Sequence, residues 1–102
     1  MKITMKPNEQ VIKASDSTFL NNGDSINGKL ILTTQRIYFK ATPNGKEHDD
    51  IEIYPKNIRD VMLFKDRLFF PQGLNIITND NLENKFLIKK REEWSKIIVS
   101  MV

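Results

Sequence analysis

The stretch from Asn27 to Phe39 reads Asn-Gly-Lys-Leu-Ile-Leu-Thr-Thr-Gln-Arg-Ile-Tyr-Phe. It opens with an Asn-Gly turn dipeptide and continues into an apolar run. A short polar patch then separates that run from a second one made of Ile, Tyr and Phe. Short apolar runs joined by a tight polar turn are typical of paired β-strands. The stretch therefore predicts a fold rich in β-structure.

Turn signals divide the rest of the chain in the same way. Asn-Gly dipeptides recur at 22–23 and 44–45, and both residue types accept positive φ angles. Pro43, Pro55 and Pro71 add further breaks. The runs between these signals cover residues 10–20, 29–33, 36–41, 50–54, 59–65, 74–78 and 85–89. Runs at this spacing predict an all-β sandwich or a small barrel.

The run over residues 59–65 shows the alternation of a half-buried strand. Val61 and Leu63 alternate with Asp60 and Met62, so we expect the first two side chains to face the core.

Phe69 and Phe70 stand directly before Pro71. Because proline is confined to strand edges and irregular segments, we expect this tract at an edge or in a loop. The two rings are interpreted as core or edge-covering residues, with an exposed patch for a partner as the alternative.

The C-terminal residues follow a helical period. Trp94, Ile97, Ile98 and Met101 fall at i, i+3, i+4 and i+7, which is one apolar face of a helix over about residues 91–102. A helix of this length is not stable alone, so we expect the Trp94 face to pack onto the strands.

Composition limits the classes of function. The 102 residues suit one domain over residues 1–102, and 39% hydrophobic with 28% charged residues argues against disorder. The absence of cysteine excludes disulfides and thiolate zinc sites. The net charge is only +3, with acids and bases interleaved, so we expect no nucleic-acid partner. No segment reaches the ~20 apolar residues of a membrane span, and no secretory signal is visible. We expect a cytoplasmic protein. If the domain binds anionic lipid, we expect it at the periphery of a membrane.

Catalytic and metal-binding patterns are weak. The single histidine, His48, lies among Glu47, Asp49 and Asp50, and no Gly-x-Ser-x-Gly turn accompanies it. A solvated histidine is therefore favoured over a catalytic one. The neighbouring acids lack calcium-loop spacing and are interpreted as solvated charges. We expect no enzyme, no metal and no cofactor.

The order of motifs resembles a GRAM domain, a member of the pleckstrin-homology-like (PH-like) superfamily. Members show a glycine, an apolar strand ending in Leu-Thr, an arginine, and an apolar strand ending near Phe. The matching positions here are Gly28, Leu30, Leu32-Thr33, Arg36, Ile37 and Phe39. Residues 51–58, 73–78 and 85–88 are similar to later strands of the family, and the helix comes last.

This resemblance implies a mainly β fold. It implies a seven-stranded antiparallel barrel of two near-orthogonal sheets, with strands within about residues 8–89 and one C-terminal helix as a cap. It also implies that Trp94 is a structural plug in a core with Leu32, Phe39, Ile53 and Phe86. Barrels of this superfamily often accept a peptide as an added strand beside the helix.

Phosphoinositide-binding relatives cluster basic residues in two loops, which match residues 21–29 and 42–50 here. The first loop sets Asp24 against Lys29, and the second sets Lys46 against several acids, so neither forms a strongly positive pocket. The densest basic run elsewhere is a candidate patch for an anionic partner or membrane: Lys85, Lys89, Lys90 and Arg91.

The leading hypothesis is a non-catalytic module that binds an unknown protein partner, or a second copy, at an open strand edge. The candidate edge residues are Arg59, Met62, Phe64 and Lys65, beside the helix face that bears Lys96 and Ser100. Peripheral binding to anionic lipid through the basic patch is the alternative.

Overall fold

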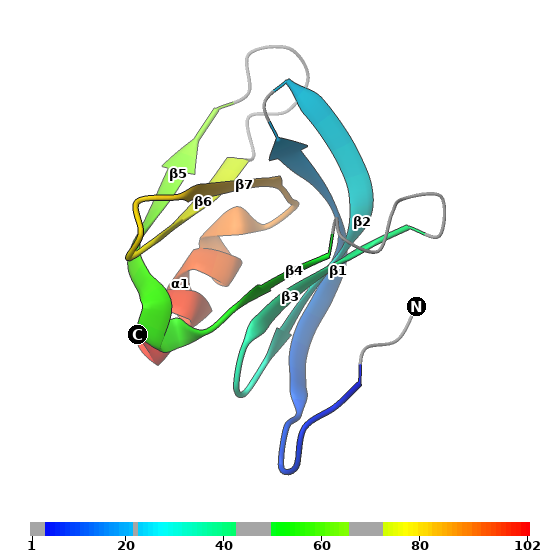
Figure 1. The fold of residues 1–102 in the computed structure, drawn as a ribbon, viewed down its shortest axis with the longest axis vertical. Helices are drawn as coiled ribbons and strands as arrows, with labels where there is room; N and C mark the ends of the chain where they lie inside the picture. The colour runs from blue at the N-terminus through cyan, green and yellow to red at the C-terminus, as the bar shows by residue number, and fades with distance from the viewer. Residues whose placement is uncertain (1–3, 22, 43–49, 66–72) are drawn as a thin grey trace.

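The computed structural model describes residues 4–21, 23–42, 50–65 and 73–102 (Figure 1). Within these ranges seven strands precede one C-terminal helix, which confirms the prediction of a mainly β fold. The strands are β1 (Val11–Asn21), β2 (Asp24–Thr33), β3 (Ile37–Ala41), β4 (Ile51–Ile53), β5 (Ile58–Phe64), β6 (Gly73–Thr78) and β7 (Glu83–Leu87). The helix α1 covers Arg91–Met101, and a short 3₁₀ helix, η2, covers Pro55–Asn57.

The strands form one antiparallel sheet in the order β4-β3-β2-β1-β7-β6-β5. β4 and β5 lie at its two ends and are not paired with each other in the described residues. The sheet is therefore not closed. The expected barrel of two near-orthogonal sheets is corrected to a single continuous, curled sheet.

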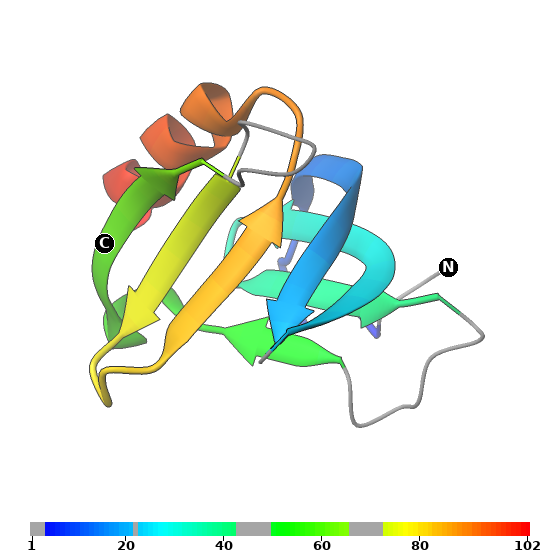
Figure 2. The ribbon, with the colours of Figure 1, turned by 90° about the horizontal axis from the view of Figure 1, so that it is seen from above.

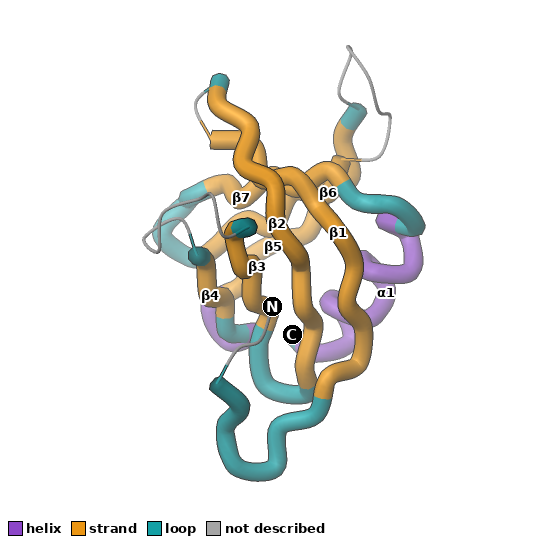
Figure 3. The backbone as a smooth tube through the Cα atoms, turned by 90° about the vertical axis from the view of Figure 1, so that its right-hand side faces the viewer, coloured by secondary structure: helices purple, strands orange, loops and turns teal. Residues whose placement is uncertain are grey.

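The long hairpin of β1 and β2 explains why one sheet takes the place of two. The base of the hairpin pairs with β3 through residues 28–32, whereas its tip pairs with β7 through residues 18–20. The natural twist of such long strands turns the sheet between these two regions. Figure 2 shows β5, β6 and β7 running across β2, β3 and β4, and Figure 3 shows β1 and β2 as two long neighbouring strands at the centre.

Gly28 lies where the hairpin passes from β3 to β7. A Cβ atom at this position would lie 2.4 Å from the carbonyl oxygen of Lys40 and 2.6 Å from Cζ of Phe39. Neither the backbone oxygen nor the core ring has room to retreat, so only glycine fits the close approach of β2 and β3.

The core fills the inside of the curled sheet. Phe19, Phe39 and Phe86 form a cluster of tilted rings with centroid distances of 5.3–5.9 Å. Thirteen buried apolar residues form the contiguous core: Leu30, Leu32, Ile37, Phe39, Ala41, Ile53, Ile58, Leu74, Ile76, Phe86, Ile88, Trp94 and Ile98. All four residues expected around Trp94 are among them.

α1 covers the inside of the sheet next to β5 and β6 (Figure 2). Trp94 and Ile98 are completely buried, and Ile97 and Met101 pack against the same core. The residue before the helix, Lys90, adopts a left-handed conformation with φ 58° and gives no side-chain cap. The helix is therefore held mainly by its apolar face.

Several details differ from the sequence-based expectations. Val61 is half-buried against the core, but Leu63 is 42% exposed. β5 is the last strand of the sheet, so its inner face is only partly covered. It also carries a bulge between Ile58 and Asp60. The expected tract of Phe69, Phe70 and Pro71 lies outside the described residues. The loop residues Lys46, Glu47, His48 and Asp49 also lie outside the described residues.

Candidate interaction site

β5 presents an open strand edge. It is hydrogen-bonded to β6 on one side and ends the strand order on the other, within the part of the chain that the structure describes. An edge strand of this kind offers unpaired backbone N–H and C=O groups to another chain. With seven residues, β5 is long enough for an extended segment to pair with it.

The side chains of β5 give this edge an apolar centre. Met62 is 51% exposed and pairs across the strands with Asn75. Leu63 pairs with the buried Leu74, so it points to the core side of the sheet, toward α1. One exposed apolar side chain therefore lies on each face of the edge.

Phe64 has a different role from its neighbours. Gly73 is its cross-strand partner, and a Cβ atom on Gly73 would lie 2.5 Å from the Phe64 ring. The half-buried ring thus lies over the glycine and covers the backbone, while the ammonium of Lys85 lies 5.6 Å from the ring centroid. Of the four candidate edge residues, Phe64 is the one that is already packed. Arg59, Met62 and Lys65 are exposed.

Arg91 fastens the start of α1 to the end of β5. Its Nη1 donates hydrogen bonds to the carbonyl oxygens of Phe64, at 2.5 Å, and Gly73, at 3.4 Å. Residues four apart share one side of a helix, so Ser95 and Val99 follow Arg91 on the side that faces β5. Val99 is 56% exposed.

The opposite side of the helix faces β1. Glu93 forms an ion pair there with Lys13 at 3.4 Å. Lys96 and Ser100, the helix residues expected beside the edge, are both exposed to solvent. α1 contacts β5, and Leu63 of the strand and Val99 of the helix are both exposed apolar side chains.

The four residues of the candidate basic patch differ in their exposure and in their interactions. Lys85 is half-buried and pairs with Glu83 at 3.5 Å, and the guanidinium of Arg91 is engaged by backbone carbonyls. Lys89 and Lys90 are exposed in the turn between β7 and α1. Only these two are adjacent and exposed.

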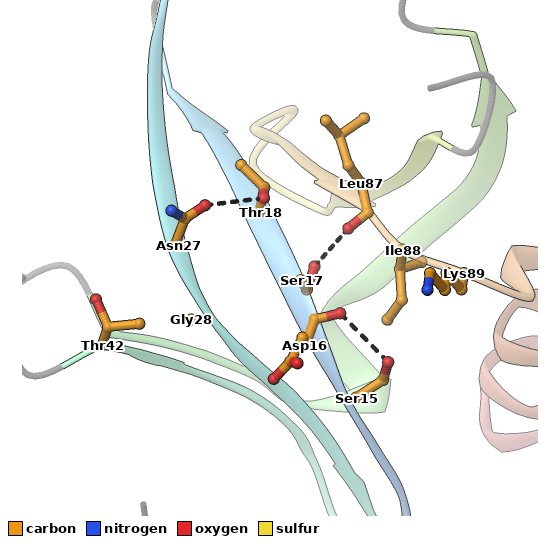
Figure 4. A pocket seen from close by; sticks show the side chains of 10 residues that line it. All are labelled: Ser15, Asp16, Ser17, Thr18, Asn27, Gly28, Thr42, Leu87, Ile88 and Lys89. Carbon is orange, nitrogen blue, oxygen red and sulfur yellow. Dashed lines mark hydrogen bonds between the residues drawn. The ribbon is translucent and has the colours of Figure 1, made fainter. Parts of the chain in front are cut away.

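Lys89 also lines a pocket of about 660 Å³ beside β1 (Figure 4). Most other polar groups in the lining are neutral, and the carboxylate of Asp16 offsets the charge of Lys89. The Ser17 hydroxyl donates to the carbonyl oxygen of Leu87 at 2.9 Å, and Thr18 donates to Asn27 at 3.1 Å. A pocket with one cation and one anion does not provide the cluster of cations that a multiply charged phosphate needs.

The opposite end of the sheet contains a buried ion pair. The Arg36 guanidinium donates from Nε to Glu9 Oε2 at 2.8 Å and from Nη2 to Glu9 Oε1 at 3.1 Å, which is a bidentate geometry. Nη1 donates to Glu52 of β4, and Nη2 also donates to the Thr4 carbonyl oxygen at 2.6 Å. The Thr33 hydroxyl donates to Glu9 Oε2 at 2.5 Å.

This network holds the segment of residues 4–10 against β2, β3 and β4. Glu9 is the only buried residue of that segment, with a side chain that is 0% exposed. The hydrogen bonds from Arg36 lower the pKa of Glu9 to about 2, and the same pairing raises the pKa of Arg36. The sequence singled out Thr33 and Arg36 only as parts of a family pattern. Glu9, 27 positions away from Arg36, had no local signal of its own.

Other kinds of site are not supported by the described residues. These residues hold no group of three His, Cys, Asp or Glu placed to bind a metal. None of their helices has the length and apolar character needed to cross a membrane.

The family model for the GRAM domain matches residues 1–101, so the chain belongs to the GRAM domain family. This confirms the resemblance found in the sequence. GRAM and PH-like domains are typically non-catalytic binding modules for proteins or membrane lipids.

The solved structures that are similar to the chain include the following two. One is the C-terminal domain of an unknown protein from Leishmania infantum, with 16% identity, a TM-score of 0.78, and coverage of 93% of this chain and 85% of that one. The other is the Vps36 N-terminal PH domain, with 12% identity, a TM-score of 0.72, and coverage of 96% and 85%. At this identity they show a shared PH-like fold. No curated protein matches the chain.

Proposed function

We propose that this domain is a non-catalytic module that binds an extended segment of another protein as an added strand along β5. The observation that carries the proposal is the open, seven-residue edge of β5, with Met62 and Leu63 exposed on its two faces. Backbone hydrogen bonds to the edge would supply affinity, and the alternating side chains would supply specificity.

The helix supports the same surface. Arg91 fixes the start of α1 against the end of β5, and Val99 adds an exposed apolar side chain on that side. A segment that pairs with β5 would therefore also contact the helix. Because both supporting elements are already in place, the domain would lose little conformational entropy on binding.

The test uses a library of random nine-residue peptides selected on the intact domain. Selected peptides should slow amide hydrogen exchange over residues 58–64. Met62→Ser should weaken their binding about tenfold, because a fully contacted apolar side chain contributes about 1.5–3 kcal/mol. Leu82→Ser is the matched control, since Leu82 is 61% exposed on the turn between β6 and β7. Failure to select any peptide, or protection confined to other strands, would reject the proposal.

Anionic lipid is the second candidate, and the exposed pair Lys89 and Lys90 is the observation in its favour. Each surface charge contributes about 1 kcal/mol near an anionic membrane, so two charges give only weak attachment. Flotation with phosphatidylserine vesicles at low and high salt tests this candidate. Binding that is lost in the double variant Lys89→Glu and Lys90→Glu would favour lipid over protein.

A further inference from the structure

We propose that the segment accepted by β5 is acidic at both ends and apolar at its centre. This inference rests on the proposed function and specifies the chemistry of the partner. It follows from the side chains along β5, which are basic at both ends of the strand and apolar at its centre.

Basic residues stand at both ends of β5. Lys56 precedes the strand, Arg59 lies near its start, and Lys65 follows its last residue, and all three are exposed. Among the described residues, Arg59 donates a side-chain hydrogen bond to Asn81 only, and a guanidinium carries five N–H donors. The one acid on this strand is Asp60. The ends of the edge therefore attract carboxylates.

The centre of the edge is apolar. Met62 lies on the outer face, and Leu63 lies on the face toward α1, where Val99 of the helix is also exposed. Arg59 and Lys65 are six positions apart, which corresponds to about 20 Å along an extended strand. The matching segment is an extended peptide in which acidic residues about six positions apart flank apolar ones.

A second copy of this chain is a poorer match for the same edge. In a two-fold antiparallel pairing with full overlap, Arg59 would face Leu63 and Asp60 would face Met62, which sets charges against apolar side chains. Moving the two-fold axis by one residue would place Arg59 opposite Lys65, and like charges in direct opposition are destabilising. An acidic partner avoids both conflicts.

The experiment determines the sequences of the nine-residue peptides selected on the intact domain and measures their affinities by fluorescence anisotropy. The expected peptides carry Asp or Glu on both sides of apolar residues, and their affinity falls with salt. The double variant Arg59→Glu and Lys65→Glu should weaken these peptides about tenfold or more, because it replaces attraction by repulsion at two positions. Peptides with Lys in place of the acids should then bind the variant better than the original domain.

The matched control is the double variant Lys89→Glu and Lys90→Glu, which changes the net charge by the same amount away from β5. An equal loss of affinity in this control would show a general charge effect and overturn the inference. Selected peptides that protect β5 but lack acidic ends would overturn the inference and leave the proposed function standing. Selection of no peptide would reject both. The single variant Lys65→Glu, outside the strand, repeats the test if the double variant unfolds.

Discussion

The two ends of the sheet are built differently. β4 has three residues, and its Glu52 side chain is engaged by Arg36 beneath the segment of residues 4–10. β5 has seven residues, and exposed apolar side chains lie on both of its faces. The free side of β4 also faces the turn between β6 and β7 across a pocket of about 350 Å³. β5 instead lies beside α1 (Figure 2).

The two end strands differ in how well they are protected against pairing with another chain. Proteins protect edge strands by keeping them short, by covering them, or by placing charges and bulges on them. β4 is short and held by an ion-pair network. β5 has a bulge and flanking charges, but Met62 and Leu63 remain exposed between them. The incomplete protection of β5 is the physical basis for assigning binding to that end.

The largest effect is expected at the β4 end, from Glu9→Gln. This change leaves the buried Arg36 without its bidentate carboxylate, and breaking a buried ion pair costs about 3–5 kcal/mol. Urea denaturation measures the loss in the free energy of unfolding. Glu93→Gln is the control, because its side chain is 57% exposed and its pair with Lys13 should contribute less than about 1 kcal/mol. Equal losses in the two variants would mean that the network does not hold this end.

The acid dependence of stability should follow from the same carboxylate. Glu9 has a pKa of about 2 in the folded protein against 4.5 ordinarily, so the unfolded chain binds its proton first as the pH falls. Its contribution, about 3 kcal/mol, is complete above pH 4.5 and is lost between pH 4.5 and 2. The difference in unfolding free energy between the original chain and Glu9→Gln, measured across this range, should shrink accordingly. A constant difference would contradict the assignment.

The smallest effect on stability is expected at the β5 end. Met62→Ser changes an exposed side chain that does not fill the core, so the free energy of unfolding should change by no more than about 0.5 kcal/mol. Thermal unfolding checks this, with Leu82→Ser as the control, because Leu82 is also an exposed apolar side chain. A loss above about 2 kcal/mol would show that Met62 is part of the packing and not of a free surface.

The local elements can be read from the order of residues along the chain. Its turn dipeptides and apolar runs predicted seven strands, and the spacing of Trp94, Ile97, Ile98 and Met101 predicted the C-terminal helix. These signals are readable because side-chain periodicity is a property of neighbouring residues. The strand over residues 59–65 was predicted from its alternating side chains, whereas its choice as the candidate binding edge came from the family resemblance. The family match agrees with the motif order around Gly28 and Arg36.

How these elements meet depends on contacts between distant parts of the chain. The long β1–β2 hairpin makes one open sheet, because its two ends pair with different strands. Folding brings Glu9 to Arg36, and it brings the guanidinium of Arg91 to the carbonyl oxygens of Phe64 and Gly73. Contacts between residues far apart in the chain depend on how strands pair and twist, and no local pattern of residues encodes that geometry.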